Sequence, residues 1–459
     1  MILHNIEKIV WGAPLLLILL FLGIYLTWIS KGVQVRYLFY SLKLAFGPQE
    51  DSGKGDITHF QALMTALAAT IGIGSIAGVA TAIAVGGLGA LFWLWVAAFL
   101  GMATKYGEAI LAVKYRITDR KGGVSGGPMY YLEKSLPSKK LSAALATFFS
   151  VAGAITAFGT GNMVQAHSVS SALFEYGLLS PWASGILLSL LTGIALFGGI
   201  KSIGKIASYL VPIMGIFYVG GGLLVLGLCY AHIPTAFSQI LSTAFTGQAA
   251  TGGFAGSTIF LAAQYGISRG VFSSEAGLGS APIADAAAKT DMPARQALVS
   301  MSGVFLTSFI VCTITGLAIA TSGVLGQVDG EGRMLDGSIM VIRAFNQTLP
   351  GSGVIITISL LLFAYSTILG WAYYGEKCME YLFGLRSVFY YRVLFTLFLI
   401  PGSLISLSAV WSFSNIMNGL MALPNLVGLF ALSRVIAKET ELFDAALQQE
   451  WSSEKQVAL

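Results

Sequence analysis

The chain has 459 residues, of which 56% are hydrophobic and only 10% are charged. Soluble domains typically carry about 25% charged residues, so this composition excludes an ordinary soluble protein and predicts a polytopic, all-α membrane protein. The net charge of +5 arises from basic residues in short loops between apolar segments, which argues against a nucleic-acid partner. The cysteines Cys229, Cys312 and Cys378 are dispersed, so we expect free thiols and neither a disulfide nor a metal site.

Apolar windows of about 20 residues, the length that crosses the hydrocarbon core, predict about eleven membrane spans. They are residues 9–30, 58–84, 88–115, 142–174, 183–199, 204–230, 256–284, 296–322, 351–376, 388–408 and 410–433. The first window is too long for a signal-peptide core and has no small-x-small cleavage site, so we expect it to remain as a span. Residues 37–46 suit either a helix in the membrane interface or a short loop packed on the bundle.

Lys and Arg residues concentrate in alternate loops, which sets the predicted orientation. The loops at residues 31–54 and 116–140 are rich in them, whereas residues 175–182 and 231–255 contain none. We therefore expect a multi-pass protein of the plasma (inner) membrane, in the lipid bilayer, with its N-terminus outside and its C-terminus in the cytosol. The polar tail, residues 434–459, is expected to form a solvated cytosolic helix without an assigned role.

Ten spans remain when the first is set aside, and they form two sets of five. The first span of each set is rich in glycine, and paired interrupted segments in two halves are the best sequence indication of a transporter site. Because five is an odd number, the two sets must run in opposite directions, as alternating access requires. The predicted units are residues 1–57 (first span and interfacial segment), 58–230 (first repeat), 231–255 (extracellular connection), 256–433 (second repeat) and 434–459 (tail).

Residues 68–78, AATIGIGSIAG, are expected to break the helix in the middle of the second span. Unpaired backbone groups are costly in lipid, so such a break needs polar partners. The following half-helix would direct N–H groups at a carboxylate, and the preceding half would offer carbonyls to a cation. The expected donors are the amides of Gly72, Ile73, Gly74 and Ser75, and the expected carbonyls are those of Ala68 and Ile71. A Gly/Ala seam for close helix packing is the alternative.

Ser366 and Thr367 are adjacent hydroxyl residues in the ninth predicted span. Hydroxyls in membrane helices commonly bond to their own backbone, which is one interpretation. In the other, the two neutral oxygens face the freed carbonyls and complete a sodium site, with Thr367 also close to the bound organic molecule. Trp371, one turn later, would then close the pocket from that side.

Arg269 and Glu275 are ionisable residues in the apolar seventh span. Such groups are costly in a membrane and usually face a cavity or each other. We expect them to fix the second broken helix or a gate, by pairing with each other or with Lys105 or Glu108. A position nearer the membrane interface is the alternative.

Polar and aromatic residues in the fourth and seventh spans complete the expected pocket. Phe272 would form an apolar wall, and Ser273 and Ser274 would supply hydroxyl contacts. Asn162 and Gln165 carry amides that can hydrogen-bond to an amino acid. The site is therefore expected to bind a small, polar molecule together with a cation.

Residues 123–127, GVSGG, match the GxSxG pattern of serine hydrolases. The motif lies in a basic loop, and the strand–turn–helix context that supports a nucleophile is missing from the sequence. We therefore expect no enzyme activity at Ser125.

The sequence resembles the alanine or glycine:cation symporter family, also called sodium:alanine symporters. The motifs that carry this resemblance are GGLGALFWLWVAAFLG (residues 86–101), GMATKYGE (101–108), GGPMYY (126–131) and SRGVFSSEAGLGSAPIADAAAKTD (268–291). The resemblance implies a LeuT-type fold with a five-plus-five inverted repeat and one extra N-terminal span. It also implies a sodium-coupled symporter of alanine or glycine, with sodium as coupling ion and without a cofactor.

By this resemblance, the carboxylate meets the amides of residues 73–75, sodium lies between residues 68–71 and the two hydroxyls of span nine, and the amino group meets carbonyls near Phe272. The family commonly has Asn at the positions of Ser75 and Ser274, so shorter hydroxyls replace amide oxygens near the positions that would form a second cation site and influence the choice of substrate. A proton-coupled carrier and an amino-acid sensor that does not transport are the alternative functions.

Overall fold

The computed structural model describes residues 2–47, 53–118, 122–175, 177–246, 259–328, 332, 334–405 and 407–457. The N-terminal part comprises α1 (Ile2–Val10), α2 (Ala13–Ile29), α3 (Val33–Arg36), α4 (Leu38–Phe46), α5 (His59–Thr70), the π-helical η1 (Gly74–Gly78), α6 (Val79–Gly86) and α7 (Gly89–Lys114). The hairpin β1 (Ile117–Thr118) and β2 (Val124–Ser125) follows, and then α8 (Pro128–Leu132), α9 (Lys139–Phe158), the π-helical η2 (Gly159–Met163), α10 (Val164–Glu175), α11 (Pro181–Phe197) and α12 (Gly199–Leu228).

The second half begins with the 3-10 helix η3 (Tyr230–His232) and α13 (Ile233–Thr246). It continues with α14 (Ile259–Ser274), α15 (Pro282–Asp285), α16 (Pro293–Val304), the π-helical η4 (Phe305–Cys312), α17 (Thr313–Ser322), α18 (Gly337–Thr348) and α19 (Gly353–Phe383). The last elements are α20 (Arg386–Gly402), α21 (Leu407–Ala431) and α22 (Ser433–Val457). Each predicted span thus contains helix, although the predicted connection 231–255 contains α13, and its residues 247–255 lie outside the described ones.

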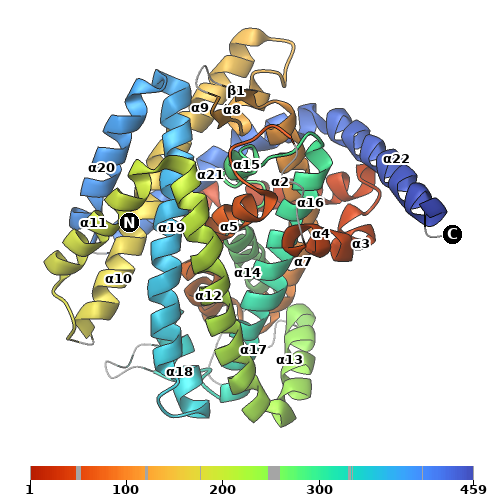
Figure 1. Ribbon diagram of the computed structural model, residues 1–459. Helices are drawn as coiled ribbons and strands as arrows, with labels where there is room; N and C mark the ends of the chain where they lie inside the picture. The colour runs from red at the N-terminus through yellow and green to blue at the C-terminus, as the bar shows by residue number, and fades with distance from the viewer. Residues whose placement is uncertain are drawn as a thin grey trace.

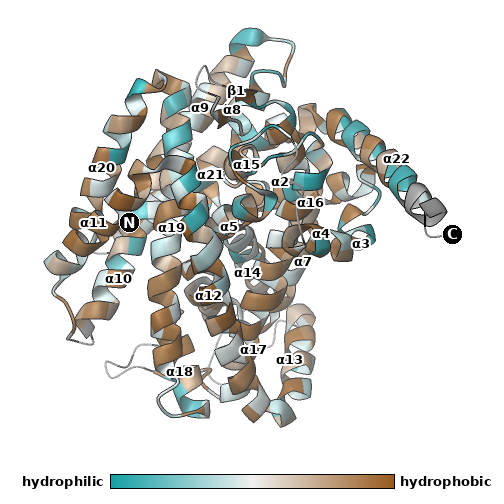
Figure 2. Ribbon diagram, viewed as in Figure 1, coloured by the Kyte–Doolittle hydropathy of each residue, from teal (hydrophilic) through white to brown (hydrophobic). Residues whose placement is uncertain are grey.

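The helices form one bundle in which distant segments pack together. Figure 1 shows α12 and α19 running side by side, with α13 and α18 at one end and β1, α8 and α15 at the other. Figure 2 shows hydrophobic residues along α11, α12 and α17, whereas hydrophilic residues gather near β1 and along α22. This distribution is the one that a lipid-exposed bundle requires.

Length and composition identify the helices able to cross a membrane. Within the described residues there are six, or up to eight if each bent pair counts as one span. The shorter α11 and α20 each have 17 residues. Residues 38–46 form helix α4, which packs on α16, so the segment is helical as one interpretation expected and packs on the bundle as the other did. Cys229, Cys312 and Cys378, all among the described residues, carry free thiols.

The second span is broken where the glycines predict. Thr58 and Gln61 form a capping box that starts α5, and the helix ends at Thr70. The two halves, His59–Thr70 and Gly74–Gly86, are bent by 56° relative to each other. A Cβ at Gly72 would lie 2.8 Å from Thr367 Oγ1, so glycine permits the close approach of α19 as well as the break.

The seventh span is broken differently. Helix α14 ends at Ser274, and residues 275–281 then contain three left-handed backbone conformations. These are at Glu275 (φ +54°), Gly277 (φ +87°) and Gly279 (φ +82°). Because Glu275 adopts this conformation without the freedom of glycine, the surrounding contacts must hold it there.

Candidate functional site

A narrow cavity of ≈ 20 Å³ lies between the two broken helices, and we call it the central cavity. It is lined by seven of the ten residues predicted to contact a substrate: Gly72, Ile73, Gly74, Gln165, Phe272, Thr367 and Trp371. They come from the α5 break, α10, α14 and α19, which are far apart in the sequence. The structure therefore brings together most of the predicted pocket.

Two of the four backbone amides predicted to bind a carboxylate at the α5 break are already hydrogen-bonded within the break, and the other two begin the next half-helix. The amide of Gly72 donates to Thr70 O at 3.0 Å, and that of Ser75 donates to Gly72 O at 3.1 Å. Both are therefore engaged within the break. Ile73 and Gly74 begin the half-helix, and the first N–H groups of a helix have no carbonyl one turn earlier to accept from them. These two amides are the better placed to meet an anion.

The predicted cation ligands meet at the end of α5. Ser366 Oγ and Thr367 Oγ1 each donate to Ala68 O at 3.1 Å. Ser366 Oγ also lies 2.9 Å from Phe363 O, so the alternative of bonding to its own helix holds for that residue as well. Ile71 follows the last residue of α5, where helix carbonyls lack an N–H partner. The arrangement gathers neutral oxygens, which suit a hard monovalent cation.

Three predicted contact residues lie outside the lining of the central cavity. Ser75 and Ser273 share a hydrogen bond of 2.9 Å, and Ser273 Oγ also lies 3.2 Å from Cys312 Sγ. Ser274 Oγ bonds weakly to Val271 O in its own helix at 3.4 Å. Successive residues of a helix point in different directions, so Phe272 can face the cavity while the two following serines do not. The hydroxyls of Ser75 and Ser273 join η1 to α14 and η4 instead, and that of Ser274 bonds locally.

Arg269 and Glu275 lie on opposite sides of Phe272. Arg269 is 6.0 Å from the centre of the Phe272 ring and lines a separate hollow of ≈ 220 Å³, together with Gln264 and Asn415. We call it the Arg269 hollow. Glu275 lines the central cavity and accepts from Ser280 Oγ at 2.6 Å. No ion pair between the two exists among the described residues, so this part of the expectation is wrong.

The other expected partners hold the main chain of the second break. Lys105 Nζ donates to Ser274 O at 2.9 Å. Glu108 Oε1 accepts from the amide of Gly279 at 3.0 Å and from Asn425 Nδ2 at 2.6 Å. The charged residues of α7 therefore form their direct hydrogen bonds with backbone and amide groups, and Lys105 interacts with Glu275 only through longer-range electrostatics.

Several residues of the central cavity escaped prediction. Thr160, Asn418 and Leu278 line it, and so does Glu275, which was expected only as a gating charge. The sequence did indicate that Asn418 is buried, because polar side chains within an apolar span usually face the protein interior. Asn162, in contrast, points away, since its Nδ2 donates to Phe395 O at 2.6 Å.

A second hollow of ≈ 280 Å³ borders Ile73 and is lined by His167, Ser338 and Leu360, among others. We call it the His167 hollow. Phe272 lines both the central cavity and the Arg269 hollow, and Ile73 lines both the central cavity and the His167 hollow. Each side chain therefore separates the central cavity from a larger space.

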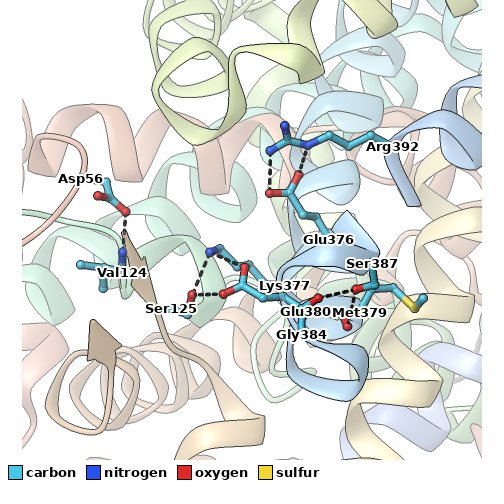
Figure 3. A network of polar contacts seen from close by, with 10 residues as sticks. All are labelled: Asp56, Val124, Ser125, Glu376, Lys377, Met379, Glu380, Gly384, Ser387 and Arg392. Carbon is cyan, nitrogen blue, oxygen red and sulfur yellow. Dashed lines mark hydrogen bonds and ion pairs between the residues drawn. The ribbon is translucent and has the colours of Figure 1, made fainter. Parts of the chain in front are cut away.

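A polar network closes the end of the bundle that carries the hairpin (Figure 3). Ser125 Oγ donates to Glu380 Oε1 at 2.7 Å, and Lys377 Nζ donates to Ser125 Oγ at 2.8 Å. The amide of Val124 donates to Asp56 Oδ2 at 2.9 Å. The hairpin thus links the segment before α5, through the Val124 amide, to α19, through the Ser125 hydroxyl. Ser125 lies in a β-hairpin and not in the strand–turn–helix context of a hydrolase nucleophile.

Comparison with known proteins identifies the family. The chain matches the sodium:alanine symporter family over residues 1–457. It is 49% identical over 453 residues to the sodium/alanine symporter AgcS of Methanococcus maripaludis, covering 98% of both chains. It is 44% identical over 443 residues to an uncharacterized transporter of Haemophilus influenzae, covering 96% of this chain and 95% of that one.

The fold has solved counterparts. The crystal structure of MhsT in complex with L-phenylalanine matches with a TM-score of 0.58 at 17% identity, covering 83% of this chain and 89% of that chain. At that identity the match speaks for the fold alone, and the fold is the expected LeuT type. With the full-length sequence match, it follows that this chain belongs to the sodium:alanine symporter family.

Proposed function

We propose that the protein imports a small neutral amino acid, alanine or glycine, by sodium-coupled symport and alternating access. The observation that carries this proposal is the meeting of Ser366 and Thr367 hydroxyls at the Ala68 carbonyl, directly before the α5 break. Sodium would bind there between neutral oxygens. The substrate carboxylate would bind on the other side of the break, at the amides of Ile73 and Gly74.

The dimensions of the central cavity favour a small substrate. Phe272 and Trp371 are bulky walls, and the cavity measures ≈ 20 Å³. A water molecule needs about 10–15 Å³ measured in this way, so the walls must move to admit even alanine, and a short side chain requires the least movement. The name of the 49% identical relative, a sodium/alanine symporter, supports the same class of substrate.

The membrane potential supplies part of the driving force. One positive charge moving through 100 mV contributes about 2.3 kcal/mol, which corresponds to roughly fifty-fold accumulation. A sodium ion that fixes the end of α5 also orders the neighbouring break. Sodium would therefore raise the affinity for the amino acid as well as drive its uptake.

The distribution of hollows supports an outward-facing state. Under the predicted orientation, the Arg269 and His167 hollows open toward the outside, and Phe272 and Ile73 stand between them and the central cavity. At the cytosolic end, the Ser125–Lys377–Glu380 network ties the hairpin to α19. Alternating access would require this network to open when the outer hollows close.

Uptake in proteoliposomes tests the proposal. We expect labelled alanine to accumulate with an inward sodium gradient and not when choline replaces sodium. Uptake that persists in choline and follows a pH gradient would support a proton-coupled carrier instead. Sodium-dependent binding in detergent without any flux after reconstitution would support a sensor.

A further inference from the structure

Three side chains from three helical regions bring hydrogen-bond acceptors to the central cavity. They are Gln165 of α10, Glu275 after α14 and Asn418 of α21. All three are buried, with 4%, 3% and 1% of their surfaces exposed. The amide oxygens of Gln165 and Asn418 have no hydrogen-bond partner. The cavity therefore contains acceptors that the described protein groups leave unsatisfied.

The orientation of Gln165 is fixed by a π-helical turn. In η2, the amide of Val164 bonds to Gly159 O, one residue further back than in an α-helix. This shift frees the carbonyl of Thr160, which accepts from Gln165 Nε2 at 3.0 Å. Because a carbonyl can only accept, the Gln165 amide must present its nitrogen to Thr160 and leave Oε1 bare.

Asn418 is held by the same threonine. Its Nδ2 donates to Thr160 Oγ1 at 3.0 Å, and its Oδ1 is the second bare acceptor. Thr160 thus orients two amides from different helices, one through its carbonyl and one through its hydroxyl. Among the described residues, other buried amide oxygens also lack a partner, Asn162 Oδ1 among them, but only those of Gln165 and Asn418 belong to side chains that line the central cavity.

Glu275 adds a carboxylate to the two amide oxygens. Its Oε2 accepts from Ser280 Oγ at 2.6 Å, and its backbone is held in a left-handed conformation. The nearest basic side chain of α7, Lys105, donates to Ser274 O at 2.9 Å, and Arg269 lies on the other side of Phe272. Trp371 also hydrogen-bonds to Glu275, and Lys105 acts on it electrostatically, but neither Lys105 nor Arg269 forms a close ion pair with the carboxylate, which lines the cavity.

We propose that Gln165 Oε1, Asn418 Oδ1 and the Glu275 carboxylate bind the ammonium group of the substrate. This inference rests on the proposed function and deepens it, because it assigns the ammonium to side chains and not to carbonyls of α14. An alkylammonium carries three N–H donors and no acceptor, which matches three acceptors in one cavity. A buried acceptor without a donor raises the free energy of the complex. The site should therefore bind ligands more tightly the more N–H groups their nitrogen donates.

Competition with ligands that differ at the nitrogen tests the wild-type protein. Labelled alanine is bound to purified protein in sodium, and unlabelled alanine, N-methylalanine and lactate compete with it. We expect about tenfold weaker competition by N-methylalanine, which has one N–H fewer, and more than about hundredfold weaker competition by lactate, which lacks the ammonium. Lactate competing within threefold of alanine overturns the inference.

Substitutions at Asn418 distinguish the effect of its hydrogen-bond acceptor from the effect of the size and shape of its side chain. We expect Asn418→Leu to weaken alanine binding and to reduce the alanine/lactate ratio about tenfold, whereas Asn418→Asp keeps the ratio at or above that of the wild type. Asn162→Leu is the matched control, because Asn162 is a buried asparagine of η2 that faces α20. The ratio of two competitors does not depend on how much protein folds.

The outcomes distinguish this inference from the proposed function. An unchanged ratio in Asn418→Leu, or an equal loss in Asn162→Leu, overturns the ammonium site while symport of alanine stands. Wild-type protein that neither binds nor transports any amino acid in sodium overturns both. A reduced ratio in Asn418→Leu together with a retained ratio in Asn418→Asp supports the assignment.

Discussion

The two broken helices differ in how their backbone groups are satisfied. The α5 break is short, lies between residues 70 and 74, and meets hydroxyls at Ala68 while Ile73 and Gly74 remain at the open start of a half-helix. The α14 break is longer, and charged or amide side chains of α7 and α21 already bind its main chain. The α5 break has main-chain groups available for ligands, whereas the main chain of the α14 break is hydrogen-bonded by other parts of the protein.

This difference indicates a division of labour. A break with open main-chain groups suits the binding of an ion and a carboxylate, since both gain from helix ends. A break whose amides and carbonyls are already bonded suits a stable shape that carries side chains, here Phe272 and Glu275, into the cavity. Substitutions at the first break should therefore change binding, and substitutions around the second should change stability.

The largest effect is expected at Gly72. A Cβ there would lie 2.8 Å from Thr367 Oγ1, which is itself bonded to Ala68 O, so Gly72→Val must displace the proposed ion ligand. We expect sodium-driven alanine uptake to fall about hundredfold. Gly78→Ala is the control, because its Cβ would meet only Arg269 Cδ, at 3.7 Å. Uptake by Gly72→Val near the wild-type rate would contradict the proposed ion site.

Substitutions around the α14 break should lower the stability of the protein. Glu108→Leu removes the acceptor of the Gly279 amide and of Asn425 Nδ2, and two buried donors without partners cost about 2–4 kcal/mol. We expect the melting temperature in detergent to fall by several degrees, and Glu108→Gln, which keeps an oxygen, to fall less. The sodium concentration for half-maximal uptake should not change. A large shift in that concentration, with the melting temperature unaltered, would assign Glu108 to binding and not to bracing.

The sequence was sufficient for the features that depend on short-range chemistry. Glycine at residues 72 and 74 predicted the α5 break, and the adjacent hydroxyls of Ser366 and Thr367 predicted their contact with Ala68. The position of each apolar segment predicted a helix there. These features need only local backbone freedom, residue type and the cost of polar groups in lipid.

The orientation of side chains within helices could not be predicted. Ser75 and Ser273 turn toward each other, and Arg269 and Glu275 point to different spaces, because helix rotation depends on packing across the whole bundle. The π-helical turn at η2 is equally invisible in sequence, although it frees the Thr160 carbonyl that orients Gln165. Asn418 was missed because a single polar residue in a span does not reveal which cavity it faces.

A smaller, more specific effect is expected at Thr367. Thr367→Ala removes one proposed sodium ligand, and we expect about tenfold more sodium to be needed for half-maximal uptake, equivalent to about 1.4 kcal/mol. The preference between alanine and glycine should remain. Ser359→Ala, a buried hydroxyl of α19 that has no hydrogen-bond partner, is the matched control. A change of amino-acid preference without a change in sodium dependence would show that Thr367 does not bind the ion.

The smallest effect is expected at the hairpin network, which lies outside the central cavity. Ser125 accepts from Lys377 and donates to Glu380, and Ser125→Ala removes both bonds while Lys377 and Glu380 remain paired at 2.8 Å. Under the proposed outward-facing state, a weaker closure at the hairpin lowers the fraction in that state, and the apparent affinity falls in proportion to that fraction. We expect the alanine concentration for half-maximal uptake to rise roughly two- to fivefold, measured from initial rates. Ser387→Ala is the control, because Ser387 bonds only within the end of α19 and its following turn. If Ser125→Ala instead abolishes binding in detergent, the hairpin supports the site itself and does not merely bias which side is open.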